Sequence, residues 1–239
     1  MNGRRIKAIV RKELREYRRN RSLVFGMAIF PLVFLIQPLV AVFNLSAADS
    51  HQLHRLHELL YMLAIPALVP AFMASYSVVG ERQQGTLEPL LTTPIRRDEF
   101  LLGKALAVLA PAVIVSYAVF AFFVLVTALF ASPGVAPAMI RGSDVIAQVV
   151  FTPLICGWSI WIAIAISTRA SEIRVAQQLS ILASLPTVAV TALTAFGVIH
   201  PSLRLALAFG VALLILDRLG WRIVAPMFDR ERLIAGGRT

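Results

Sequence analysis

Cysteine is almost absent from this chain of 239 residues. Cys156 is the only one, so the chain can form no internal disulfide and no metal site built from several cysteines. Charged residues are also scarce: they make up 15% of the chain, against about 25% in an average soluble domain. Hydrophobic residues make up 58% and are gathered into long runs, which excludes an ordinary soluble domain and indicates a membrane protein.

Five stretches contain no Asp, Glu, Lys or Arg, and each is long enough to cross a hydrocarbon core of about 30 Å as a helix. They are residues 23–43, 59–79, 105–130, 145–168 and 175–203. A sixth crossing is expected at residues 201–221, of which only 205–216 are free of charge, because Arg204 and Asp217 would lie near opposite interfaces. The sequence therefore predicts an all-α membrane protein with six transmembrane helices.

The positions of lysine and arginine predict which side of the membrane each loop faces. Of the 23 Lys and Arg residues, Arg55, Arg141 and Arg204 fall on one side and all the others on the opposite side. The positive-inside rule places the richer side, with both chain termini, in the cytoplasm. The net charge of +10 therefore reflects topology and attraction to anionic membrane lipids, and it does not indicate a nucleic-acid partner.

This orientation divides the chain into three parts. Residues 1–22 form a cytoplasmic interfacial helix, residues 23–225 form the transmembrane domain with a cytoplasmic loop at 80–104, and residues 226–239 form a cytoplasmic tail. A cleaved signal peptide is not expected, because the first apolar run and the segment before it are both too long. The expected location is the cell membrane, plasma or inner.

Residues 4–19 are expected to form an amphipathic helix with basic residues around an apolar arc, and such a helix lies in the membrane interface. The arc contains Ile6, Ile9, Val10, Leu14 and Tyr17, with Glu13 among them. The simpler interpretation of Glu13 is a pair with a neighbouring arginine near the headgroups. The alternative is a contact with the basic or hydroxyl groups of residues 80–104.

The loop at residues 80–104 carries the most specific pattern in the chain. Gly85 permits a break from the preceding helix, and Thr86 can cap a short new one. Pro94 suits the first turn of the helix that leads into the third crossing. The pattern predicts a helix end, a short helix, a tight turn and a longer helix in succession.

The short helix after Thr86 would present Leu87, Leu90 and Leu91 to the cytoplasm. An apolar face in that place needs a protein partner or must fold back on its own loop. The glycines at 80 and 85 resemble half of a phosphate-binding loop, but the lysine that must follow them is absent. We therefore expect no nucleotide site in this chain.

The same loop is similar to that of type-2 ATP-binding-cassette (ABC) exporter permeases. The residues that carry the resemblance are Glu81, Gly85, Thr86, Leu87, Glu88, Leu90, Leu91, Pro94, Gly103 and Lys104. Residues 11–14 and 227–233 also resemble the beginning and end of such permeases. The layout of an interfacial helix, six spans and short outer loops is similar along the whole chain.

The resemblance implies an export permease with no catalytic, metal or cofactor site of its own. In that family the permease pairs with a second permease, either an identical copy or a sister chain, and with two separate cytoplasmic ATPase subunits. The short helix that follows the second span would be the coupling helix that docks on the ATPase. The chain lacks the large extracellular domain of some members, so no particular substrate is indicated.

The fifth crossing carries a row of small polar side chains at helical spacing. The row consists of Gln177, Ser180, Ser184, Thr187, Thr191 and Thr194. It is interpreted either as a face for close helix packing or as a lining of the transport path or of the interface with the second permease. The resemblance supports the path, because the second and fifth spans line it in that family.

His51, His54 and His57 lie three residues apart in the first outer loop. Neighbouring histidines on a helix can bind a metal or sense protons, but a solvated helix face is the interpretation we adopt.

Two other classes of membrane protein, ion-coupled carriers and membrane-embedded enzymes, need polar or ionisable residues at positions where this sequence is not expected to have them. An ion-coupled carrier requires an ionisable group deep in the membrane, and none of Asp144, Glu172 and Asp217 is expected there. A membrane-embedded enzyme requires paired acids, a metal set or an activated nucleophile, and no such set is recognisable. A non-transporting membrane assembly protein remains the main alternative to a permease.

Overall fold

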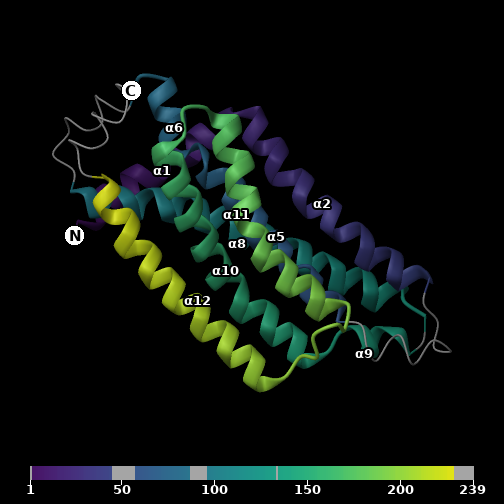
Figure 1. The fold of residues 1–239 in the computed structure, drawn as a ribbon. Helices are drawn as coiled ribbons and strands as arrows, with labels where there is room; N and C mark the ends of the chain where they lie inside the picture. Colours follow the sequence, from purple (N-terminus) through teal and green to yellow (C-terminus); the bar gives the residue numbers. More distant parts are fainter. Residues whose placement is uncertain (1, 45–56, 87–95, 133, 229–239) are drawn as a thin grey trace.

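The computed structural model describes residues 2–44, 57–86, 96–132 and 134–228, and every regular element within these ranges is a helix (Figure 1). The elements are α1 (Gly3–Arg19), α2 (Arg21–Asn44), α4 (Glu58–Tyr61), α5 (Ala64–Ala74), α6 (Tyr76–Gln83), α8 (Arg97–Phe130), α9 (Val135–Met139), α10 (Gly142–Arg169), α11 (Ile173–Ala195), α12 (Leu203–Val224) and the 3₁₀ helix η2 (Ala225–Phe228). The long helices form one bundle, with α1 and α6 at one end and α9 at the other.

Within the described part of the chain, five helical segments are long and apolar enough to cross a membrane. They are Arg21–Asn44, Glu58–Gln83, Arg97–Phe130, Gly142–Arg169 and Ile173–Ala195, which correspond to the five uncharged runs. The second of them comprises α4, α5 and α6. α12 is 22 residues long and packs on α10, but its charged residues keep it outside this group. The sixth crossing therefore stays a prediction.

The helix formed by the fifth uncharged run, α11, is shorter than the run itself. α11 ends at Ala195, although no charged residue occurs before Arg204. Gly197 adopts a φ of 71°, and the amide of Val198 donates to the carbonyl of Leu193 at 2.9 Å. A glycine in this left-handed conformation ends a helix while satisfying its last carbonyls. Hydropathy alone cannot reveal such a turn inside an apolar run.

The second crossing segment, Glu58–Gln83, lies in the interior of the bundle. It is 94% buried over its most apolar window, whereas the corresponding values for the other four segments range from 17% to 44%. Its central helix, α5, packs against α2, α8, α10 and α11. The other helices therefore enclose it, and they supply most of the surface that faces outward.

The apolar side of α1 is turned against protein. Its apolar arc is buried at Ile9 and Tyr17 and half-buried at Ile6, Val10 and Leu14. α1 packs mainly on α8, where a methyl group added at Gly103 would lie 2.7 Å from Ile9 Cγ2. α8 begins at Arg97, two turns before the uncharged run, and its first turns offer the surface that α1 covers. The arc therefore packs on another helix, and the expectation that α1 lies in the membrane interface stays a prediction.

The opposite end of the bundle is joined through His57. Its Nδ1 lies 2.9 Å from Asp144 Oδ2, and its Nε2 lies 3.2 Å from a guanidinium nitrogen of Arg141. Because a guanidinium can only donate, Nε2 accepts and Nδ1 carries the proton shared with Asp144. The expectation of a solvated face is therefore wrong for His57, while His51 and His54 lie outside the described residues.

Candidate coupling site

α6 ends at the loop that the sequence pattern singles out. The amide of Gly85 donates to the carbonyl of Arg82 at 3.1 Å, and the amide of Thr86 donates to that of Glu81 at 3.0 Å. Gly85 has a φ of 66°. These two bonds around a left-handed glycine form a Schellman helix end, so the chain leaves the helix at Gly85 in a fixed direction.

A cluster of four charged side chains lies beside this helix end, and we call Lys12, Glu13, Glu81 and Lys104 the charge cluster. Lys104 Nζ, on α8, lies 3.0 Å from a carboxylate oxygen of Glu13 and 3.0 Å from one of Glu81. Lys12 Nζ, on α1, lies 2.7 Å from the other oxygen of Glu81. Lys104 also donates to the carbonyl of Ser77 at 2.7 Å. Alternating charges therefore join α1, α6 and α8.

The charge cluster is nearly sealed from solvent. The side chains of Glu13, Glu81 and Lys104 are 2%, 5% and 0% exposed, and only Lys12 reaches the surface. Removing a charge from water costs several kcal/mol, which close opposite charges and hydrogen bonds must offset. Burial alone would raise the pKa of Glu13, but Lys104, Lys12 and the hydroxyl of Tyr17 hold it below its usual value. Glu13 is therefore an anion at neutral pH.

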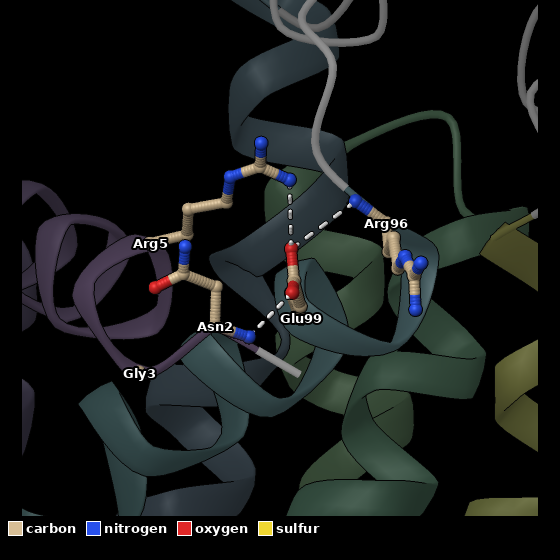
Figure 2. A pocket seen from close by; sticks show the side chains of 5 residues that line it. All are labelled: Asn2, Gly3, Arg5, Arg96 and Glu99. Atoms are coloured by element: carbon tan, nitrogen blue, oxygen red, sulfur yellow. Dashed lines mark hydrogen bonds and ion pairs between the residues drawn. The ribbon is translucent and has the colours of Figure 1, made fainter.

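A second contact fastens the beginning of α8 to the beginning of α1 (Figure 2). The carboxylate of Glu99 accepts from the backbone amide of Asn2 at 2.7 Å and from that of Arg96 at 3.4 Å. The guanidinium of Arg5 lies 3.6 Å from the same carboxylate. Together with Gly3, these residues line a surface pocket. Glu99 thus places a negative charge at the amino-terminal ends of two helices, where it is favourable.

The helices on either side of residues 87–95 are both bonded to α1. Near the end of α6, Glu81 pairs with Lys12 of α1, and at the beginning of α8, Glu99 pairs with Arg5 of α1. Buried ion pairs therefore join α6 and the first turns of α8 to α1. The described residues contain no group of three metal-binding side chains.

Three of the eight predicted coupling residues are described, and the other five lie outside the described residues: Leu87, Glu88, Leu90, Leu91 and Pro94. Gly85 and Thr86 are exposed at the end of α6. The carboxylate of Glu81 is turned inward and lies beside Lys12 and Lys104, and its role in coupling stays a prediction.

The contacts of Glu13 distinguish between the two interpretations of this residue, a pair with a neighbouring arginine and a contact with residues 80–104. The pair with a neighbouring arginine is wrong, because Glu13 binds Lys104, which is the last residue of the 80–104 loop. Lys12 and the carbonyl of Ser77 were not predicted as members of the site. The signal in the sequence was an acid inside an apolar arc, which implies a buried cation from another segment.

The polar row of α11 is turned toward the inside of the bundle. Its members Ser180, Ser184, Thr187, Thr191 and Thr194 are buried, and Gln177 is half-buried. Three of the hydroxyls donate to carbonyls of the preceding turn of α11, at 2.8 to 2.9 Å. α11 packs on α5 and α10. In this conformation the row is a close-packing face, and a role in a transport path stays a prediction.

Asp217 brings an acid from α12 to the middle of α10. A methyl group added at Gly157 would lie 2.8 Å from Asp217 Oδ1, so the carboxylate packs directly on that glycine. Gly157 lies near the midpoint of α10 (Gly142–Arg169). The expectation that no acid lies centrally is therefore wrong for Asp217, because the glycine makes room for a side chain from another helix.

A comparison with protein families matches almost the whole chain. The model of the ABC-2 family transporter proteins matches residues 7–228, which include the charge cluster and the helices from α2 to η2. No curated protein matches the sequence.

Proposed function

The chain belongs to the ABC-2 family of transporter proteins, and we propose that it is the permease subunit of an ATP-driven exporter. Family membership and the long apolar helices make it a multi-pass membrane protein. The family forms the membrane part of ABC transporters and is not itself catalytic, so hydrolysis of ATP belongs to a separate subunit.

In the proposed complex, two copies of a cytoplasmic ABC ATPase bind a pair of permeases. The pair consists of two copies of this chain or of this chain and a sister chain. Each permease crosses the plasma or inner membrane six times, with α12 as the last crossing and both termini in the cytoplasm. The length of α12 supports the count, because 22 residues span about 33 Å. The distribution of Lys and Arg supports the orientation.

The observation that carries the proposal is the charge cluster, which joins α6, the helix directly before the predicted coupling loop, to α1 and α8. Separating a buried ion pair costs about 3–5 kcal/mol, so α1, α6 and the first turns of α8 move together when the loop is pushed or pulled. An ATPase that closes on ATP and opens after hydrolysis would move the loop in this way. The charge cluster would pass that movement to the spanning helices.

Affinity purification of the tagged chain in mild detergent tests the proposal. An ABC ATPase should co-purify, and the complex should hydrolyse ATP while the chain alone does not. Leu87→Asp should release the ATPase, because a charge in a desolvated contact costs several kcal/mol. Gln52→Asp, in the first outer loop, is the matched control and should retain it. Full retention by Leu87→Asp would exclude the loop as the docking element.

An ion-coupled carrier is the second candidate, and the position of Asp217 beside Gly157 favours it. The two candidates differ in what the chain does alone. An exporter subunit reconstituted without an ATPase should not take up protons into vesicles. Proton uptake that Asp217→Asn abolishes would favour the carrier. A non-transporting assembly protein would show neither proton uptake nor an associated ATPase.

A further inference from the structure

The second crossing segment is interrupted shortly before the coupling loop. α5 ends at Ala74 and α6 begins at Tyr76, with a turn residue between them: Ser75 keeps helical φ and ψ, and its amide donates to the carbonyl of Ala71 at 3.2 Å. The first amides of a new helical turn lack partners within that turn and need acceptors from elsewhere. The amides of Val78 and Val79 donate to the hydroxyl oxygen of Ser167, at 3.0 Å and 3.1 Å. Ser167 lies on α10 and is 0% exposed.

The other end of α6 is also bonded to α10. The guanidinium of Arg82 donates to the carbonyl of Thr168 at 2.9 Å and to that of Ala170 at 3.1 Å. These carbonyls lie at the carboxyl end of α10, where the last carbonyls of a helix lack intrahelical donors and a cation is favourable. The amide nitrogen of the Gln83 side chain lies 3.4 Å from the carbonyl of Ser171 just beyond.

Thus α6 is separated from α5 by a turn at Ser75 and is bonded at both ends to α10, the helix of the fourth span. We propose that Ser167 and Arg82 are positioning residues, which make α6 and the end of α10 a single moving part. The proposal rests on the proposed function, in which the loop after α6 receives the ATPase. Movement of the loop is then passed directly to α10 in the fourth span. The turn at Ser75 allows α6 to move without an equal displacement of α5 in the second span.

Two contrasts within the structure support this assignment. Ser159 lies on the same buried side of α10, two turns before Ser167, but its hydroxyl has no hydrogen-bond partner in the described structure. Ser184 of α11 is buried too, and its hydroxyl donates to its own helix. Ser167 differs from both, since its oxygen accepts two amides from another helix.

Hydrogen–deuterium exchange of the purified chain, read at single residues, tests the bonding. Ser167→Ala should make the Val78 amide exchange roughly three- to tenfold faster, as expected for loss of one hydrogen bond. Ser159→Ala should leave it unchanged, and Ser167→Thr, which keeps an acceptor oxygen, should restore it. Amides of α11 should not change in any variant. Unaltered exchange at Val78 in Ser167→Ala would overturn the proposal.

Cysteine labelling in the complex with the co-purified ATPase tests the transmission. Ser143→Cys, at the far end of α10 and exposed, is labelled with and without ATP and vanadate in a chain with Cys156→Ala. The nucleotide-dependent change in labelling should be lost in Ser167→Ala and in Arg82→Gln, although the ATPase stays bound and active. It should persist in Ser159→Ala and Ser167→Thr.

The outcomes distinguish failure of the proposed α6–α10 coupling from failure of the proposed permease function. Persistence of the labelling change in both Ser167→Ala and Arg82→Gln would overturn the role of the α6–α10 bonds, with the permease function intact. Absence of an ATPase from the wild-type preparation would instead remove the proposed function, and the exchange measurement would still decide whether α6 and α10 are bonded as described.

Discussion

The ammonium of Lys104 lies 3.0 Å from a carboxylate oxygen of Glu13, although 91 residues separate the two in sequence. Neither side chain is more than 2% exposed. Each charge is tolerated in the interior only because the other is there, together with Glu81 and Lys12. The position of α1 on α8 is therefore specified by charge as well as by its apolar arc.

Lys104→Met keeps most of the side-chain volume but leaves Glu13 and Glu81 as buried acids with Lys12 as their nearby cation. Removing one partner of a buried pair typically costs about 3–5 kcal/mol. We expect the Tm of the purified chain to fall by several degrees in detergent. Lys7→Met, at an exposed position of α1, should have no effect. An unchanged Tm for Lys104→Met would show that the charge cluster does not stabilise the fold.

The pH dependence of stability should report on Glu13. Its pKa is lower in the folded chain than the ordinary value of 4.5, because the two lysines and Tyr17 outweigh the effect of burial. The folded state is therefore favoured above pH 4.5, and this contribution is lost as the pH falls through the lower folded pKa. Measured between neutral pH and about pH 3, the Tm of Glu13→Gln should depend less on pH than that of the wild type. Parallel curves would contradict this assignment.

Gly103→Ala should push α1 away from α8, because the added methyl would meet Ile9 Cγ2 at 2.7 Å. Overpacking of this kind costs about 1–3 kcal/mol. The double variant Gly103→Ala with Ile9→Ala should recover part of the loss, although Ile9→Ala alone is destabilising. Thermal unfolding of the four proteins gives the coupling energy. Simple additivity would mean that the two side chains do not meet.

The polar row of α11 should tolerate bulk less well than the rest of the helix. Ser184→Leu and Thr191→Leu insert a large side chain at positions that are 0% and 4% exposed, which typically costs about 1–3 kcal/mol. Ala189→Leu, on the exposed side of the same helix, is the control. Equal expression and Tm for all three would refute a special role for this face.

The orientation can be tested with single cysteines in a chain that carries Cys156→Ala. Ser50→Cys should react with a membrane-impermeant maleimide added to intact cells, and Gln84→Cys should react only after the membrane is opened. The expectation follows from the excess of Lys and Arg on one side of the predicted spans. Labelling of Gln84→Cys in intact cells would reverse the proposed topology.

The spans were predictable from sequence because each depends on a local run of apolar residues. The end of α11 was not, since a turn at Gly197 interrupts a run that has no charge until Arg204. The helix that leads into the third crossing was predicted to begin at Pro94, close to Arg97, where α8 begins. The contact of its charged first turns with α1 was not predicted, because it depends on residues distant in sequence.

The candidate site was only half visible in the sequence. Two of its residues can be recognised from the sequence. Gly85 is a residue type that permits a helix end, and Glu13 is an acid within an apolar arc. The partner of Glu13 is fixed by how α1 crosses α8, which no local pattern contains. The bonds of Ser167 were equally invisible, because a serine near a helix end gives no sign that it accepts amides from another helix.

The enclosed position of the second crossing also dictates the order in which the molecule can be completed during its synthesis. Glu58–Gln83 leaves the ribosome before α8, α10 and α11, which supply most of its surroundings. Until α10 is inserted, the amide of Val78 has no Ser167 to bind, and the segment must remain in contact with lipid or with the insertion machinery. The central helix of the finished bundle is thus among the first to be made and among the last to reach its native surroundings.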